Sequence, residues 1–148
     1  MACEGGEYWL GLDNIHYLTT YCSHNRLRID VATCSGAEGI SYYDSLVVLN
    51  EDYNYAASAL APSGISMHLL NTIGRPGFKT LDVDSICSTS FGNGGWWYDA
   101  QRFCTSFNPN GVYSSSCSNN LSNIWISNWP TNGFHGLNRV AIKLRPQA

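Results

Sequence analysis

Two carboxylates, Asp82 and Asp84, stand at alternate positions in a stretch without regular periodicity. Alternate carboxylates in a loop can converge on a hard cation, because Ca²⁺ takes about six to eight oxygen ligands. Two carboxylates complete such a shell only with help from backbone carbonyls and water. The alternative is that both side chains cap turns by accepting backbone hydrogen bonds. The pair is therefore a candidate calcium site, with turn capping as the competing interpretation.

The six cysteines are the second group of residues whose side chains could carry chemistry. None belongs to a Cys-x-x-Cys pair, which disfavours a zinc ribbon or a thioredoxin-type redox site. An even number indicates disulfides formed in an oxidising compartment, and a reduced cytosolic chain is the alternative. The six are Cys3, Cys22, Cys34, Cys87, Cys104 and Cys117.

Patterns typical of enzymes are missing from the sequence. It has no Gly-x-Ser-x-Gly, no His-Glu-x-x-His and no phosphate-binding loop. The net charge is −3 and the eight Lys and Arg are scattered without a basic run, so we expect no nucleic-acid partner. No apolar stretch approaches the roughly 18 residues of a membrane-spanning helix. These observations predict neither catalysis nor a membrane span.

Tryptophans are concentrated in the second half of the chain. Trp96, Trp97, Trp125 and Trp129 could form a platform on which sugars stack. We favour the other interpretation, that they form the core of an irregular region, because large aromatic side chains supply much buried area per residue.

The spacing of apolar residues predicts the strands and helices around these side chains. Alternation and turn signals predict strands at 8–10, 27–31, 42–49, 53–55 and 137–144. A short helix is expected at 15–20, and helical turns at 56–60 and 66–70. From Asn71 onward Gly, Ser, Asn and Pro become dense and periodicity is lost. An ordered region of this kind is usually functional.

The 148 residues suit a single domain. We predict an α+β fold in which an antiparallel sheet with short helices is joined to an irregular, loop-rich binding region. The sheet region is expected at 1–70, the loop-rich region at 71–138 and a strand that returns to the sheet at 139–148.

Several segments, read in order, resemble the C-terminal half of a fibrinogen-related domain. The most specific is Gly94-Gly95-Trp96-Trp97-Tyr98, bracketed by Cys87 and Cys104. The others are 6–16, 27–31, 78–84, 110–113, 125–129 and 142–146, so that all five tryptophans fall on family positions. The resemblance covers nearly the whole chain and implies an extracellular recognition module. It also implies a leading subdomain that this chain lacks.

The resemblance implies a disulfide between Cys87 and Cys104 and leaves three pairings open for the other four cysteines. It places a calcium site at Asp82 and Asp84. The family loop before the first cysteine is longer, and Ile86 stands where a further acidic residue is common. We therefore expect calcium to bind weakly or not at all.

A ligand pocket is implied beside the second cysteine, where related lectins hold acetyl groups. Its position corresponds here to Phe91, Cys104, Thr105, Asn119, Asn120 and Phe134. Thr105 replaces a histidine, and the Asn pair replaces a tyrosine and an alanine, so the pocket should prefer neutral polar groups such as sugar hydroxyls. A strained peptide is expected between Phe103 and Cys104.

The resemblance implies a secreted, lectin-like domain that binds glycans or acetylated groups. A role in innate defence and assembly into a homo-oligomer are further expectations from the same resemblance. The alternative is an extracellular matrix or adhesion module that binds a protein and no sugar, and a further alternative is a truncated, non-functional product. Residues 1–4 do not form a recognisable secretory signal, so secretion is expected from the resemblance and the cysteines. Asn120-Leu121-Ser122 is a glycosylation sequon.

Overall fold

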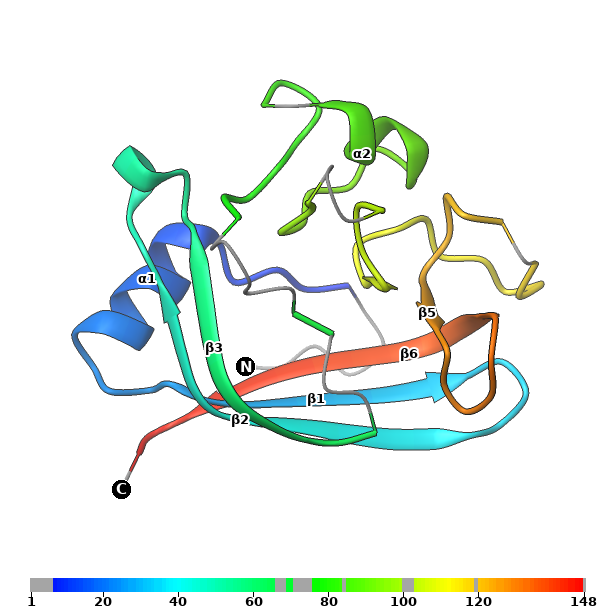
Figure 1. The fold of residues 1–148 in the computed structure, drawn as a ribbon, viewed down its shortest axis with the longest axis horizontal. Helices are drawn as coiled ribbons and strands as arrows, with labels where there is room; N and C mark the ends of the chain where they lie inside the picture. Colours follow the sequence, from blue (N-terminus) through cyan, green and yellow to red (C-terminus); the bar gives the residue numbers. More distant parts are fainter. Residues whose placement is uncertain are drawn as a thin grey trace.

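The computed structural model describes residues 7–65, 69–70, 76–83, 85–99, 103–118 and 120–147. It confirms the α+β fold: an antiparallel sheet, two short α-helices and a region dominated by loops (Figure 1). The helices are α1 (Leu12–Thr20), the 3-10 helix η1 (Glu51–Tyr53) and α2 (Ser85–Ser90). The strands are β1 (Arg26–Thr33), β2 (Glu38–Val48), β3 (Ala57–Gly64), β4 (Phe107–Asn108), β5 (Trp125–Ser127) and β6 (Phe134–Arg145). No helix in these ranges has the length and apolar character needed to span a membrane.

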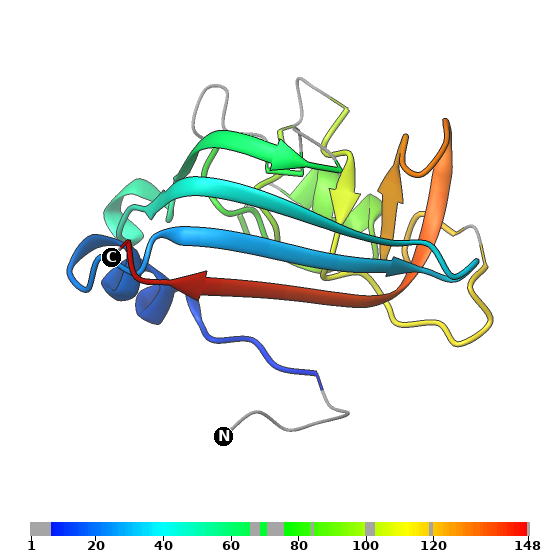
Figure 2. The same ribbon diagram turned by 90° about the horizontal axis from the view of Figure 1, so that it is seen from below.

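The sheet has the order β3-β2-β1-β6-β5-β4, so the last long strand lies beside the first (Figures 1 and 2). Alternation along β1 explains its two faces. Leu27, Ile29 and Val31 are buried in the core, and Tyr43 of β2 lies opposite Leu27 on the same face. Directly opposed residues in an antiparallel pair share a face. The residues between them on β1 therefore point away from the core.

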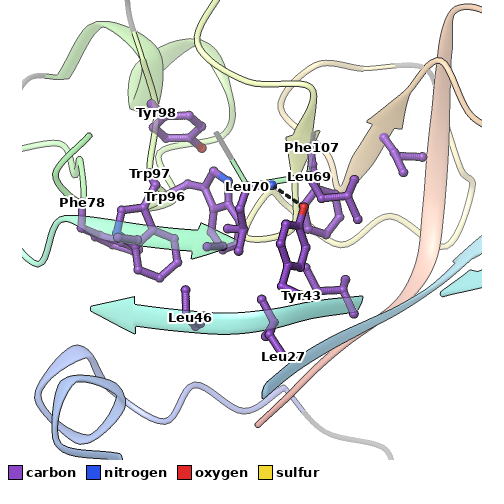
Figure 3. Packing of buried hydrophobic residues seen from close by; sticks show 14 of the residues in the cluster. Leu27, Tyr43, Leu46, Leu69, Leu70, Phe78, Trp96, Trp97, Tyr98 and Phe107 are labelled. Carbon is purple, nitrogen blue, oxygen red and sulfur yellow. Dashed lines mark hydrogen bonds between the residues drawn. The ribbon is translucent and has the colours of Figure 1, made fainter. Parts of the chain in front are cut away.

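Aromatic side chains fill the space between the sheet and the loops (Figure 3). The rings of Trp96 and Trp97 lie 5.1 Å apart, and Phe78 meets Trp97 edge-on at 5.1 Å. The indole Nε1 of Trp97 donates to the carbonyl of Tyr55 at 2.8 Å. Trp96, Trp97 and Trp125 are buried, which confirms that these tryptophans form core rather than a sugar platform.

Two local predictions are wrong in the first half of the chain. Residues 53–55 are not a strand but the end of η1 and a turn, in which Asn54 and Tyr55 have positive φ. Residues 56–60 are not helical, because from Ala57 they pair with β2 as β3. Edge pairing with a long strand outweighs the weak local preference of this Ala-rich stretch.

The ends of two other elements also differ from the prediction. Residues 8–10 have no regular secondary structure. Trp9 instead packs on Phe78, with the centroids of the two rings 5.8 Å apart. β6 begins at Phe134, inside the range expected to be loop-rich, because Phe134 and the two residues after it pair with β5. The predicted helical turn at 66–70 lies largely outside the described residues.

Candidate recognition site

The predicted Cys87–Cys104 disulfide is confirmed. The Cα atoms of the two residues lie 5.6 Å apart, and the bond joins α2 to the far end of the tryptophan loop. A second constraint acts at Cys104, since its backbone N–H and carbonyl both bond to Asp99, at 2.9 and 2.8 Å. The position of Cys104 is therefore set by one covalent and two hydrogen bonds.

Phe103, which precedes this cysteine, is held out into solvent. Its φ is 58° and that of Cys104 is 66°, both in the left-handed region that side chains other than glycine rarely adopt. Such a conformation costs about 1–3 kcal/mol per residue and persists only where the surroundings enforce it. The strain expected between Phe103 and Cys104 is therefore seen as positive φ at both residues. Among the described residues, the cis peptide bond is the one between Trp129 and Pro130. The ring of Phe103 is 96% exposed.

Thr105 is not the free hydrogen-bond donor that the sequence suggested. Its hydroxyl donates to the carbonyl of Phe107 at 2.8 Å and accepts from the N–H of the same residue at 3.1 Å. This closed pair of bonds forms the turn that leads into β4. The one proton of the hydroxyl is already used, so Thr105 offers little to a ligand.

Phe91, predicted as a pocket wall, is part of the core and only 8% exposed. Its ring lies 5.8 Å from Tyr98 and 5.5 Å from Trp125. Trp125 in turn meets Phe134 edge-on at 4.8 Å, and Phe134 is 51% exposed. The aromatic row therefore runs from the interior to the surface, with Phe134 at its outer end. Only Phe134 of this row is positioned to meet a ligand.

Asn108 was missed by the sequence analysis, yet it joins three parts of the loop region. Its Nδ2 donates to the carbonyls of Phe91 and Asn123, at 3.1 and 2.9 Å, and its Oδ1 accepts from the Tyr98 hydroxyl at 2.7 Å. Asn108, Phe91 and Tyr98 are buried, and burial raises the pKa of Tyr98 to about 12. No periodicity marks such a residue, because its partners are carbonyls and not a side-chain pattern.

A second disulfide, Cys34–Cys117, settles one of the open pairings. Cys34 follows β1, and its N–H also donates to the carbonyl of Gly136 at 2.9 Å. The bond ties the β1–β2 turn to the loop before β5. Within the described part of the chain Cys22 has no disulfide partner, and Cys3 lies outside it.

An exposed apolar group lies on the loops next to this disulfide. The N–H of Val112 donates to the carbonyl of Ser122 at 2.8 Å, which brings these two loops together. The carbonyl of Leu121 accepts from Trp125 Nε1 at 2.9 Å, and the ring of Trp125 contacts that of Phe134 at the start of β6. The members, called the loop patch below, are Val112, Tyr113, Leu121 and Phe134, each about half exposed.

Asn120, one of the two asparagines expected in the pocket, belongs to the same loop. Asn120 is exposed, and its Oδ1 accepts from the N–H of Ser122 at 2.9 Å, which forms a local turn. The sequon that begins at Asn120 is thus on the surface. Asn119 lies outside the described residues.

At the predicted calcium site, Asp82 accepts a hydrogen bond from the hydroxyl of Thr80, which lowers its pKa. Thr80 and Val83 bond to each other through both backbone groups at 3.2 Å, so their carbonyls are engaged within the turn. Asp84 lies outside the described residues, among which no group of three or more His, Cys, Asp or Glu is gathered for a metal. Asp82 is thus bonded within this turn, and weak or absent calcium binding stays a prediction.

Comparisons with known proteins agree with this architecture. The family model of the fibrinogen beta and gamma chains, C-terminal globular domain, matches residues 2–147. Ryncolin-4 of Cerberus rynchops is 34% identical over 97% of this chain and 42% of its own length. Human angiopoietin-2 is 31% identical over 95% of this chain and 29% of its own length. The chain thus spans less than half of these relatives.

Solved structures show the same fold. The fibrinogen-like globe domain of human ANGPTL2 aligns with a TM-score of 0.83 and 27% identity, over 100% of this chain and 69% of that one. A lamprey fibrin D-dimer, complexed with a Gly-His-Arg-Pro-amide peptide, aligns with a TM-score of 0.76 at 21% identity, over 96% of this chain and 51% of that one.

Proposed function

Because the chain belongs to the family of fibrinogen C-terminal globular domains, which are recognition modules, we propose that it is an extracellular, lectin-like domain. In this proposal it binds a glycan through the loops around Cys104. The two disulfides support an oxidising, extracellular setting.

The exposed ring of Phe103 is the observation that carries the proposal. Phe103 is almost fully exposed and has a positive φ next to a disulfide, and strained backbone of this kind clusters at ligand-binding sites. A rigid aromatic face can stack on the apolar face of a pyranose ring. Phe103, which was not among the predicted pocket residues, is therefore assigned as the stacking platform. Asn120 and Phe134 are kept from the predicted set as ligand-facing residues.

The chemistry of this site favours a neutral sugar over an acetyl group. Thr105 has its hydroxyl proton engaged, and Phe91 is buried, so neither builds the polar anchor or the wall of an acetyl cup. Phe103, Asn120 and Phe134 carry no ionisable group. Binding should accordingly change little between about pH 5 and 8, the range in which histidine titrates.

The test is calorimetric titration of N-acetylglucosamine and of mannose into the wild type, Phe103→Ala and Tyr53→Ala. Tyr53 is an exposed aromatic on η1 and serves as the matched control. We expect mannose to bind the wild type and the control alike, and Phe103→Ala to bind about tenfold more weakly, the loss of about 1.4 kcal/mol typical of one stacking ring. Acetyl-selective binding, or binding unchanged in Phe103→Ala, would contradict the proposal.

A protein partner is the second candidate, and the loop patch favours it. Apolar residues grouped on loops and rimmed by polar ones are typical of protein-binding surfaces. The lamprey fibrin of the same fold was solved with a peptide ligand. If this candidate holds, Tyr113→Ser with Leu121→Ser should abolish binding of the partner, while Phe103→Ala leaves it unchanged.

A further inference from the structure

The cations that are scattered along the sequence come together on one face of the sheet. Arg26 lies opposite Arg145, and Arg28 lies opposite Lys143, across the β1–β6 pair. Arg139 lies opposite Ala32 in the same register. Since Leu27, Ile29 and Val31 point into the core, all five cations point to the other side. The basic face is defined as Arg26, Arg28, Arg139, Lys143 and Arg145.

This face is locally positive on an acidic chain. Five of the eight Lys and Arg lie there, with three acids, Asp30, Glu38 and Asp44, paired to them. The local charge is +2, whereas the whole chain carries −3. Figure 2 shows β1, β2 and β6 with no described segment drawn across them on this side. An anion approaching the protein is therefore attracted to this face and repelled elsewhere.

A buried acid holds two of the cations in place. Asp30 is only 4% exposed, and its carboxylate bonds to Arg28 Nε at 2.6 Å and to Lys143 Nζ at 2.5 Å. The side chains of Arg28 and Lys143 are nevertheless 43% and 56% exposed. These cations are preorganised and still open to solvent. They line a hollow of about 520 Å³ together with the Arg139–Glu38 ion pair.

The cations are arranged in rows rather than around a point. Arg139, Lys143 and Arg145 lie along β6, and at about 3.3 Å per residue the stretch from Arg139 to Arg145 covers roughly 20 Å. Arg26 and Arg28 run beside them on β1, about 4.8 Å away across the sheet. Two adjacent rows of cations match a linear ligand that carries negative charge at repeated intervals.

We propose that the basic face binds a linear sulfated polysaccharide that lies along β1 and β6. The two disulfides indicate an oxidising compartment, where sulfated glycans are the abundant linear polyanions. The face is a poor site for single-stranded nucleic acid, because Tyr42 is its one large exposed aromatic in the described residues and bases need stacking platforms. This site is distinct from the loops around Cys104 and does not depend on them.

The test is surface plasmon resonance of the full chain on a size-defined heparin oligosaccharide about 20 Å long, matched to the cation rows. Arg139→Gln with Lys143→Gln and Arg145→Gln should weaken binding at least about tenfold at roughly 0.15 M salt and flatten its salt dependence. The matched control is Arg75→Gln with Lys79→Gln and Arg102→Gln, which removes the same charge from the cations outside β1 and β6. It should change the affinity less than about twofold.

A second variant keeps the proposal falsifiable if the triple change disturbs folding. Arg139→Lys with Arg145→Lys retains the charge and should bind within about threefold of the wild type. An equal loss of heparin affinity in the two triple-glutamine variants would overturn the proposal. Binding of desulfated heparin as tight as that of heparin would also overturn it. Tighter binding of polyglutamate or of duplex DNA than of heparin would overturn it too.

Discussion

Asp30 is a buried carboxylate that pairs with two cations, Arg28 and Lys143, on the sheet. Burial opposes its ionisation, but the hydrogen bonds from Arg28 and Lys143 outweigh burial and hold its pKa below the usual value. A carboxyl group with a lowered folded-state pKa stabilises the fold above its unfolded pKa of about 3.9. This contribution is lost as the pH falls through the folded-state pKa.

Asp30→Asn should accordingly destabilise the protein by about 2 kcal/mol at neutral pH, a value reduced by the solvent exposure of both partners. Urea unfolding of both proteins between about pH 7 and 2 measures the difference, which should shrink below about pH 4. A difference that stays constant down to the lowest pH would show that the ion pairs are not its source. Asp44→Asn, at an exposed pair, is the control.

Asn108 carries the second prediction at the residue scale. Asn108→Ala leaves the buried Tyr98 hydroxyl, the buried Phe91 carbonyl and the part-buried Asn123 carbonyl without this partner, which should cost about 2–3 kcal/mol. Asn120→Ala, at an exposed turn, should cost less than about 0.5 kcal/mol. Chemical denaturation of both variants distinguishes them, and equal stabilities would remove Asn108 from its structural role.

At the scale of elements, disulfides hold the loops where hydrogen-bonded strands are short. β4 and β5 contain two and three residues, and Cys34–Cys117 links the loop before β5 to the β1–β2 turn. In the chain-entropy model a crosslink with a sequence separation of 83 stabilises by about 4 kcal/mol. Cys34→Ser with Cys117→Ser should lower the unfolding free energy by that order. Cys22→Ser should leave it unchanged within about 0.5 kcal/mol, as measured by urea titration.

The turn at 80–83 leads to a prediction about calcium. The carbonyls of Thr80 and Val83 and one oxygen of the Asp82 carboxylate already accept hydrogen bonds within the turn, which makes them poorer ligands for a cation. Calorimetry should show no calcium affinity in the sub-micromolar range, and chelation should leave the melting temperature unchanged. Tight binding, or a melting temperature that falls on chelation, would require ligands that the turn does not supply.

At the scale of the whole molecule, the two proposed sites lie on different sides of the sheet. The loops around Cys104 carry exposed apolar side chains, and the opposite face of the sheet carries the cations. Phe103 and the basic face have no residue in common. We therefore expect heparin at saturation to change the affinity for mannose by less than about twofold. A larger effect in a competition titration would mean that the sites are coupled or overlap.

Elements with a local residue pattern could be predicted from the sequence alone. Alternation at Leu27, Ile29 and Val31 was enough to predict β1, because a strand with one buried face needs apolar residues at every second position. The tryptophans were predicted to be core from their size alone. The Cys87–Cys104 bond followed from the resemblance, since its two ends bracket the most specific motif.

The tertiary structure decided everything that depends on distant partners. β3 forms because β2 is present to pair with it, and Cys117 bonds to Cys34 because the fold brings the two together. Scattered cations became one basic face only through the register of β1 with β6, and strand register is a property of the pair that neither sequence segment contains.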